Sequence, residues 1–159
     1  MQQENNRSKT VAVIFWILTA ICMATIFYFS SRPANQSAGQ SSVVTLFLQR
    51  LFHTEAITEH MVRKFAHFTE FAGLGFLTNT ALYFTNGKQN FPLGAGIGSA
   101  YAGTDEIHQI FVDGRSCQFS DWALDTAGVI TGALILSILI LIIGKIIEHK
   151  KQKNEDKKF

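Results

Sequence analysis

The feature that most limits the possible folds is an uncharged run near the amino terminus, Val11–Phe29, which reads VAVIFWILTAICMATIFYF. About 20 apolar residues in a helix, at about 1.5 Å each, match the roughly 30 Å hydrocarbon core of a bilayer. Segment 121–147 carries a similar aliphatic run, with Asp121 and Asp125 at one end and Lys145 at the other. Both segments therefore predict helices that cross a membrane.

Two further segments of similar length, 65–84 and 91–110, carry ionisable clusters but are rich in Phe, Leu and Gly. We therefore predict an all-α chain that forms one domain over residues 1–159. Its core is a four-helix transmembrane bundle, with spans at about 11–29, 65–84, 91–110 and 122–147. The first span is expected to be retained rather than cleaved. Its apolar run exceeds the roughly 7–15 residues of a signal-peptide core, and no small-x-small cleavage site follows it directly.

A short amphipathic segment separates the first two predicted spans. Residues 41–52 read SSVVTLFLQRLF, and their apolar side chains recur at i, i+3, i+4 and i+7 on one helical face: Val44, Phe47, Leu48 and Leu51. This stretch is too short to span a bilayer, so we expect an interfacial helix on the outer surface. Pro33 is expected to end the preceding helix, and a second short helix at 54–61 is expected to lead into the next span.

The distribution of basic residues predicts which side of the membrane the termini face. With four spans both termini share one side, which holds nine of the 14 Lys and Arg residues: Arg7, Lys9, Lys88, Lys145, Lys150, Lys151, Lys153, Lys157 and Lys158. The positive-inside rule then places both termini, including the basic tail 148–159, in the cytoplasm of a cell whose plasma membrane the chain spans. No basic face interleaved with aromatic residues occurs, so a nucleic-acid partner is not expected.

Carboxylates are predicted at one depth on three of the spans. At about 1.5 Å per helical residue, Glu70 and Asp105 lie about 8 Å below the outer ends of their helices, and Asp125 lies about 6 Å below. This follows from connectivity alone. Each carboxylate belongs to a polar stripe on its own helix, and such stripes are expected to face the bundle interior rather than lipid.

We predict that these stripes form one ligand pocket on the extracytoplasmic side. A charge at the centre of a membrane helix costs about 2.5–3.5 kcal/mol on insertion scales, so such residues are rarely incidental. The alternative is a structural clasp in which the acids merely neutralise the cations. Because buried ion pairs add little or nothing to stability, a functional pocket is the favoured interpretation. Its predicted ligand-binding residues are Arg63, Lys64, His67, Glu70, Asp105, Glu106, His108, Gln109, Arg115, Asp121 and Asp125.

Small residues are expected to bring the predicted helices close together. They let membrane helices approach to distances where dispersion and weak hydrogen bonds hold them. Close packing would also force the polar stripes of neighbouring helices together. Small-xxx-small pairs occur at Gly94/Gly98, Ser99/Gly103 and Gly128/Gly132.

Four strings of the sequence stand out together: Phe29-Ser30-Ser31, Arg63-Lys64-x-x-His67-x-x-Glu70, the block from Thr104-Asp105-Glu106-Ile107-His108-Gln109 through Asp113-Gly114-Arg115-Ser116, and Asp121-x-x-x-Asp125-Thr126-x-Gly128-x-x-x-Gly132. With these strings the chain resembles the VanZ-like family of bacterial membrane proteins, over roughly residues 11–143. Asp113 stands where this family often has proline, and Cys117 replaces a residue that is usually small; both positions lie in the outer turn.

The resemblance implies a cell-envelope protein that is associated, in the founding member, with teicoplanin-type glycopeptide resistance, and it supplies no chemical mechanism. Our first hypothesis is an accessory protein whose pocket binds an amphiphile, either a lipid-linked cell-wall precursor or a lipoglycopeptide antibiotic. Arg63, Lys64 and Arg115 would hold its phosphate or carboxylate. Membrane lipids are expected partners, and a homo-oligomer is compatible with these features.

The second hypothesis is a membrane-embedded hydrolase or transferase that acts on a lipid-linked phosphate. Arg115 would stabilise developing negative charge, and a histidine, with His108 as the candidate, would be the proton shuttle. The general base would be one of three carboxylates: Glu70, Asp105 or Asp125. A third hypothesis is a small transporter or flippase. It is ranked last, because the polar layer occupies only the outer half of the predicted bundle.

No metal and no cofactor are expected from the sequence. The ligand types of His67, Glu70, Asp105, His108 and Asp125 suit a divalent cation, but their spacing is not a recognised metal motif. Cys22 and Cys117 lie at different predicted depths and have no CxxC spacing, so both are expected to be free thiols.

Overall fold

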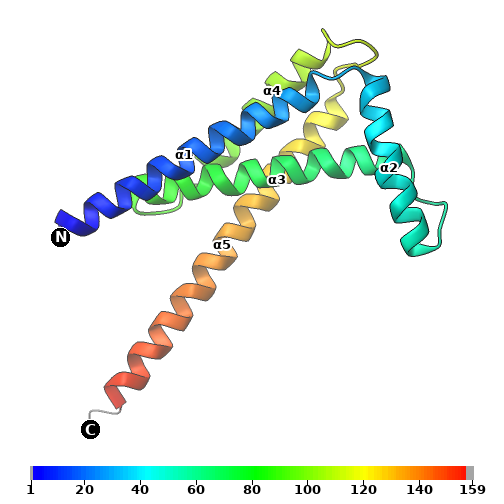
Figure 1. Ribbon diagram of the computed structural model, residues 1–159. Helices are drawn as coiled ribbons and strands as arrows, with labels where there is room; N and C mark the ends of the chain where they lie inside the picture. Colours follow the sequence, from blue (N-terminus) through cyan, green and yellow to red (C-terminus); the bar gives the residue numbers. More distant parts are fainter. Residues whose placement is uncertain (1, 157–159) are drawn as a thin grey trace.

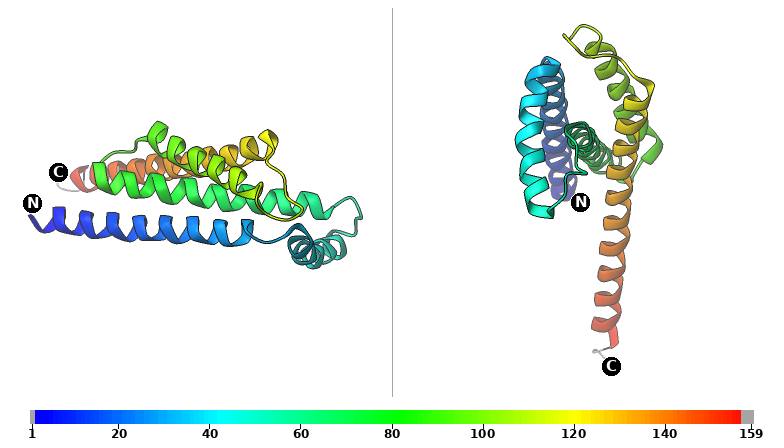
Figure 2. Two further views of the ribbon diagram at one scale, coloured as in Figure 1. Left: turned by 90° about the horizontal axis from the view of Figure 1, so that it is seen from above. Right: turned by 90° about the vertical axis from the view of Figure 1, so that its right-hand side faces the viewer.

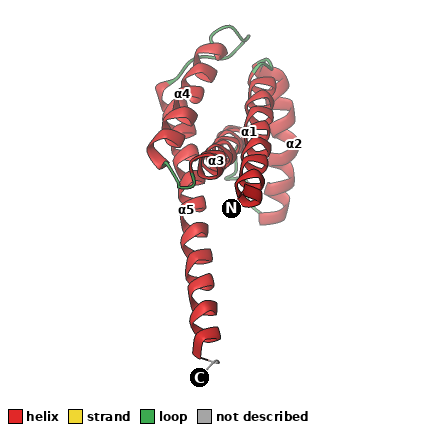
Figure 3. Ribbon diagram, turned by 90° about the vertical axis from the view of Figure 1, so that its left-hand side faces the viewer, coloured by secondary structure: helices red, strands yellow, loops and turns green. Residues whose placement is uncertain are grey.

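The computed structural model describes residues 2–156, and within that range its regular secondary structure is entirely helical (Figures 1 and 3). This confirms the predicted all-α class. The segments predicted as spans at 11–29, 65–84 and 122–147 lie within helices, and the segment at 91–110 matches α4 except for its last residue. The elements in chain order are α1 (Gln2–Ser30), α2 (Ala34–Phe52), α3 (Glu59–Asn86), α4 (Phe91–Gln109) and α5 (Phe119–Asp156).

Local sequence explains where α2 and α3 begin. α1 ends at Ser30, and Pro33 is the N-cap of α2, so the amphipathic helix starts at Ala34 rather than near residue 41. The predicted short helix at 54–61 is wrong: α3 begins at Glu59, where the Thr58 side chain accepts a hydrogen bond from the Met61 amide. Threonine at an N-cap satisfies a free amide of the first turn, and this cap separates α3 from the preceding bend.

α3 is the central helix. α1 lies along one side of it, and α4 and α5 lie along the other (Figure 2). Because the helices alternate in direction, four of their ends meet at one end of the molecule (Figure 1). These are the C-terminal ends of α1 and α4 and the N-terminal ends of α3 and α5. The predicted polar stripes are therefore gathered at that end.

Backbone contacts between α3 and α5 depend on glycine. A Cβ atom added at Gly132 would lie 1.9 Å from the Ala72 carbonyl oxygen, and one at Gly75 would lie 2.1 Å from the Val129 carbonyl oxygen. A Cβ atom added at Gly128 would likewise lie 2.5 Å from the Phe68 carbonyl oxygen. The predicted packing role of Gly128 and Gly132 is thus confirmed. At such separations any side chain would push the two helices apart.

Two helices of the described chain are long and apolar enough to cross a membrane, judged by length and composition: Ser8–Ser30 and Phe119–Glu155. α3 and α4 are not among them, so the four-span bundle stays a prediction. Large apolar side chains stand exposed on both qualifying helices, including Ile17, Ile21, Leu141 and Ile147, each more than half exposed. Such surfaces are typical of contact with lipid or another protein.

α2 runs across the end of the molecule where the polar stripes gather, and it packs against α3 (Figures 1 and 2). Its predicted apolar face is not buried against the bundle, since Phe47 and Leu51 are about 60% exposed. Thr45 is instead buried, at 5% exposed. α2 therefore presents an apolar surface outward at this end.

We expect Gly132→Ala to destabilise the fold and Gly144→Ala on the same helix to leave it unharmed. A Cβ at Gly144 meets nothing within 4 Å, whereas one at Gly132 meets backbone that can yield only by moving α3. Overpacking of this kind costs typically about 1–3 kcal/mol. Melting temperatures of the detergent-purified variants would measure the contrast, and equal melting temperatures would contradict it.

Candidate functional site

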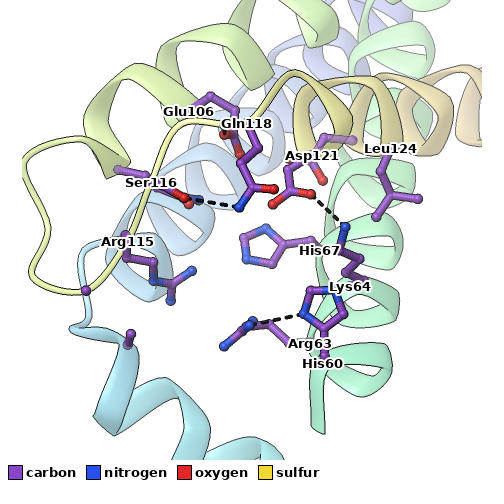
Figure 4. Close-up of a pocket in the computed structure, with 14 residues that line it drawn as sticks. His60, Arg63, Lys64, His67, Glu106, Arg115, Ser116, Gln118, Asp121 and Leu124 are labelled. Atoms are coloured by element: carbon purple, nitrogen blue, oxygen red, sulfur yellow. Dashed lines mark hydrogen bonds and ion pairs between the residues drawn. The ribbon is translucent and has the colours of Figure 1, made fainter. Parts of the chain in front are cut away.

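A cavity of about 100 Å³ lies where the ends of α3, α4 and α5 meet the loop 110–118 (Figure 4). It contains three cationic side chains and three acidic ones. The first group comprises Arg63, Lys64 and Arg115, and the second comprises Glu106, Asp121 and Asp125. The remaining lining residues are Ala34, His60, His67, Gln109, Gly114, Ser116, Gln118 and Leu124. We call this the head cavity.

Helical spacing places the α3 residues of the head cavity. His60, Arg63, Lys64 and His67 follow i, i+3, i+4 and i+7, which puts them on one face. Arg115 is placed by the loop instead. Gly114 takes a φ of 73°, which suits glycine. The Asp113 carbonyl accepts a hydrogen bond from the Ala34 amide and ties the loop to the start of α2.

Only one of the three cations is paired with an acid. Lys64 Nζ lies 2.8 Å from Asp121 Oδ1, and Arg63 donates to His60 Nδ1 at 3.3 Å. Among the side chains that the structure describes, neither Arg63 nor Arg115 has a carboxylate oxygen within 4 Å, and the buried Nε of Arg115 has no partner. The structural clasp is therefore incomplete. Figure 4 shows both guanidinium groups pointing into the same space.

The Arg115 guanidinium is held in an unfavourable environment. Burial lowers its pKa from the ordinary value and the nearby positive charge of Arg63 lowers the pKa further, while the negative charges of Asp105 and Glu106 offset part of this shift. An arginine remains protonated in a protein despite such a shift. The two guanidinium groups therefore repel each other across the cavity.

Two aspartates beside the cavity are almost completely buried. Asp105 is 2% exposed, and its Oδ2 accepts hydrogen bonds from Ser30 Oγ at 2.6 Å and from Gln109 Nε2 at 3.2 Å. Its Oδ1 has no partner. Asp125 is 1% exposed, and neither of its oxygens has a partner within the described part of the chain. One oxygen of each carboxylate and a ring nitrogen of His67 all lie within 4.8 Å of one another.

A second cavity of about 240 Å³ adjoins the first and lies between α1, α2 and α3. The two share Arg63, His67 and Arg115. The rest of its wall is mainly apolar or weakly polar and also contains Glu70. These remaining residues are Phe29, Ser37, Ser41, Val44, Val62, Ala66 and Glu70. We call this the tail cavity.

A protein-family model described as VanZ/LLP1 matches residues 15–141. The chain belongs to the VanZ/LLP1 family. The matched range contains α2, α3, α4, most of α1 and both cavities, and it confirms the resemblance that the sequence motifs predicted. No curated protein and no solved structure matches the chain. Together, VanZ/LLP1 membership and the two apolar helices indicate a membrane protein.

The structure of this VanZ/LLP1 member brings most of the predicted pocket residues together. Glu70 lies in the tail cavity, and Asp105 lies behind the head cavity, hydrogen-bonded to Gln109. Whether these side chains bind a ligand stays a prediction. Those that line the head cavity are Arg63, Lys64, His67, Glu106, Gln109, Arg115, Asp121 and Asp125.

His108 lines neither cavity, although the sequence predicts it as a ligand-binding and candidate catalytic residue. Its Nε2 lies 3.0 Å from Ser31 Oγ, and the centroid of its ring lies 4.4 Å from the centroid of the Phe27 ring on α1. The polar residues that the sequence places on one stripe of α4 point in different directions, for a geometric reason. At 3.6 residues per turn, His108 and Gln109 point about 100° apart, on opposite sides of Asp105.

Sequence reasoning missed Ser30 as part of the site. It is fully buried at the end of α1, and it binds Asp105 across the bundle. The Phe29-Ser30-Ser31 string of the family resemblance was the available signal. Gln118 was also missed. Its backbone amide donates to Glu106 Oε2 at 2.9 Å, and only the folded loop brings these two groups together.

We expect Ser30→Ala to lower the free energy of unfolding by about 1–3 kcal/mol, because it removes a buried partner of a carboxylate. Ser42→Ala is the matched control, since Ser42 is only half-buried and donates locally to the Gly39 carbonyl. That variant should stay within about 0.5 kcal/mol of wild type. Unfolding in detergent with increasing denaturant measures both, and equal losses would contradict the prediction.

Proposed function

We propose that this VanZ/LLP1 member is a cell-envelope protein that binds the anionic head group of an amphiphile in the head cavity. The observation that carries the proposal is the pair of guanidinium groups, Arg63 and Arg115, which face one space without a carboxylate partner in the described chain. An anion between them would replace repulsion by two charge-assisted contacts. Arginine forms such contacts bidentately with phosphate and carboxylate.

The sizes of the two cavities suit an amphiphile. The head cavity, at about 100 Å³, is several times larger than the roughly 10–15 Å³ that one water molecule needs, so it admits a phosphate or carboxylate group. The adjoining tail cavity offers Phe29, Val44 and Val62 to an apolar chain. Val44 is itself about half exposed on α2, so such a chain would continue onto the apolar outer face of that helix.

The proposed topology has α1, α3, α4 and α5 as four spans and α2 at the outer interface. Both termini would be cytoplasmic, and both cavities would face outward. The excess of basic residues at the opposite end of the molecule supports this orientation. Exposed apolar side chains on α2 support its place at the headgroup level.

Two sources share the required chemistry: a lipid-linked cell-wall precursor, with its phosphates, and an amphiphilic glycopeptide such as teicoplanin. We favour the precursor, because Arg63 and Arg115 match a compact phosphate and the tail cavity matches a hydrocarbon chain. Resistance to teicoplanin would then follow indirectly, from altered handling of wall precursors. This link to resistance is an analogy with the family.

Arg115→Gln and Arg63→Gln are each expected to weaken binding of a polyprenyl phosphate by about 10- to 100-fold, the equivalent of losing a hydrogen bond to a charged group. Arg50→Gln is the matched control: it removes the same charge from the exposed surface of α2. Titration of the detergent-purified proteins, monitored by native mass spectrometry, measures the affinities. Equal loss in the Arg50 control would contradict the assignment.

A parallel titration with teicoplanin separates the two sources. Binding of teicoplanin but not of polyprenyl phosphate would assign the site to the antibiotic instead. Binding of neither would overturn the proposal. In cells, a gene deletion that changes neither precursor pools nor teicoplanin susceptibility would count against both.

The native cysteines test the proposed orientation. Cys117 is exposed in the loop before α5, and Cys22 lies within α1; both are free, as predicted. We expect a membrane-impermeant maleimide to label intact cells at Cys117, and the Cys117→Ser variant to remain unlabelled. A Lys88→Cys change in that background should react only after permeabilisation. Labelling of Lys88→Cys in intact cells would show that the chain has the opposite orientation to the one proposed.

A further inference from the structure

We propose that His67, Asp105 and Asp125 hold a divalent transition-metal ion at the wall of the head cavity. The sequence predicted no metal, and the anion binding proposed above does not require one. The inference rests on how three helices converge: His67 comes from α3, Asp105 from α4 and Asp125 from α5. Two of the five residues with suitable ligand types, Glu70 and His108, are not part of this group.

The distances suit one shared ion. Each residue offers one ligand atom, and these atoms all lie within 4.8 Å of one another. In a tetrahedral site with metal–nitrogen and metal–oxygen bonds of about 2.0–2.2 Å, two ligand atoms of one ion lie about 3.4 Å apart. Side-chain movements of up to about 1.4 Å would therefore complete the site. The set of one imidazole and two carboxylates, without thiolate, suits Zn²⁺, Mn²⁺ or Fe²⁺.

Unpartnered oxygens point to a cation at this place. Both oxygens of Asp125 and Oδ1 of Asp105 lack hydrogen-bond partners in the described chain, although the two residues are 1% and 2% exposed. Leaving such groups unsatisfied is costly. No Lys or Arg side chain that the structure describes lies within 4 Å of either carboxylate. A dication would neutralise the two carboxylates while His67 binds as a neutral imidazole.

The surroundings of Asp105 are those of a supported ligand. Ser30 Oγ and Gln109 Nε2 both donate to Oδ2, and Gln109 also donates to Ser30 at 3.3 Å. This network fixes the carboxylate and leaves Oδ1 free. Hydrogen bonds to the far side of a metal ligand typically orient it in this way, and losing them costs about 10- to 100-fold in metal affinity.

The ion would have an open side toward the head cavity, because His67 and Asp125 both line it. Three protein ligands with one open position are typical of zinc sites that bind an exchangeable group. Figure 4 shows the His67 ring pointing into the space that Arg63 and Arg115 face. A phosphate held by the two guanidinium groups would therefore lie within reach of the ion.

The test measures metal directly. The full-length protein is purified in detergent with any affinity tag removed, stripped with a chelator, and reloaded with Zn²⁺ or Mn²⁺. Elemental analysis after gel filtration should find about one ion per wild-type chain, the stoichiometry of a single three-ligand site. His67→Ala and Asp125→Asn should lose it. Asp121→Asn is the matched control, because Asp121 lines the same cavity but pairs with Lys64.

Two further measurements keep the proposal open to refutation if the ligand variants do not fold. Zn²⁺ or Mn²⁺ should raise the melting temperature of the stripped wild-type protein, since binding to the folded state stabilises it. Ser30→Ala should weaken metal affinity about 10-fold or more. An absent melting shift with substoichiometric metal would overturn the site. So would equal metal loss in Asp121→Asn. Arg115→Gln should retain the ion, which separates failure of anion binding from failure of metal binding.

Discussion

The contact between the backbones of α3 and α5 is the constraint on which the rest of this structure depends. Glycine at 75, 128 and 132 allows carbonyl oxygens of one helix to lie where a Cβ of the other would otherwise stand. In a membrane the hydrophobic effect does not drive helices together, so small residues and dispersion take over that role. His67 lies one residue before Phe68 and Asp125 three residues before Gly128, so the contact between Phe68 and Gly128 brings the imidazole and the carboxylate together.

The polar end of the molecule departs from what stability alone would favour. A bundle held by ion pairs would match each buried charge with an opposite one, yet only Lys64 and Asp121 form such a pair at this site in the described chain. Two guanidinium groups and two aspartates are left without a partner of opposite charge, and three of these four side chains, those of Arg63, Arg115 and Asp125, line the head cavity. Groups that destabilise the isolated fold in this way are typical of sites that a ligand completes. Our two proposals assign an anion to the guanidinium groups and a cation to the aspartates.

The arrangement of cavities follows from α2. α2 begins directly after its N-cap, Pro33, close to the end of α1. The Ala34 amide donates a hydrogen bond to the Asp113 carbonyl, and this bond holds the loop that carries Arg115 over the ends of the bundle. One element thereby shapes two features: the placement of Arg115 and the apolar wall that Val44 supplies to the tail cavity. The short amphipathic segment is thus part of the site as well as its cover.

The sequence by itself determined the all-α class, the four long helices with their order, and the end of the molecule at which the charged residues gather; it did not determine the start of α2 or the loop before α3. These properties are local or follow from connectivity: hydropathy sets each segment, and alternating direction carries Glu70, Asp105 and Asp125 to one end. The rotation of each helix about its axis was decided only by the tertiary structure. That rotation directs Gln109 inward and His108 toward α1, and it selects Asp121 as the partner of Lys64. It arises from glycine contacts between helices distant in sequence, which residue spacing within one helix cannot report.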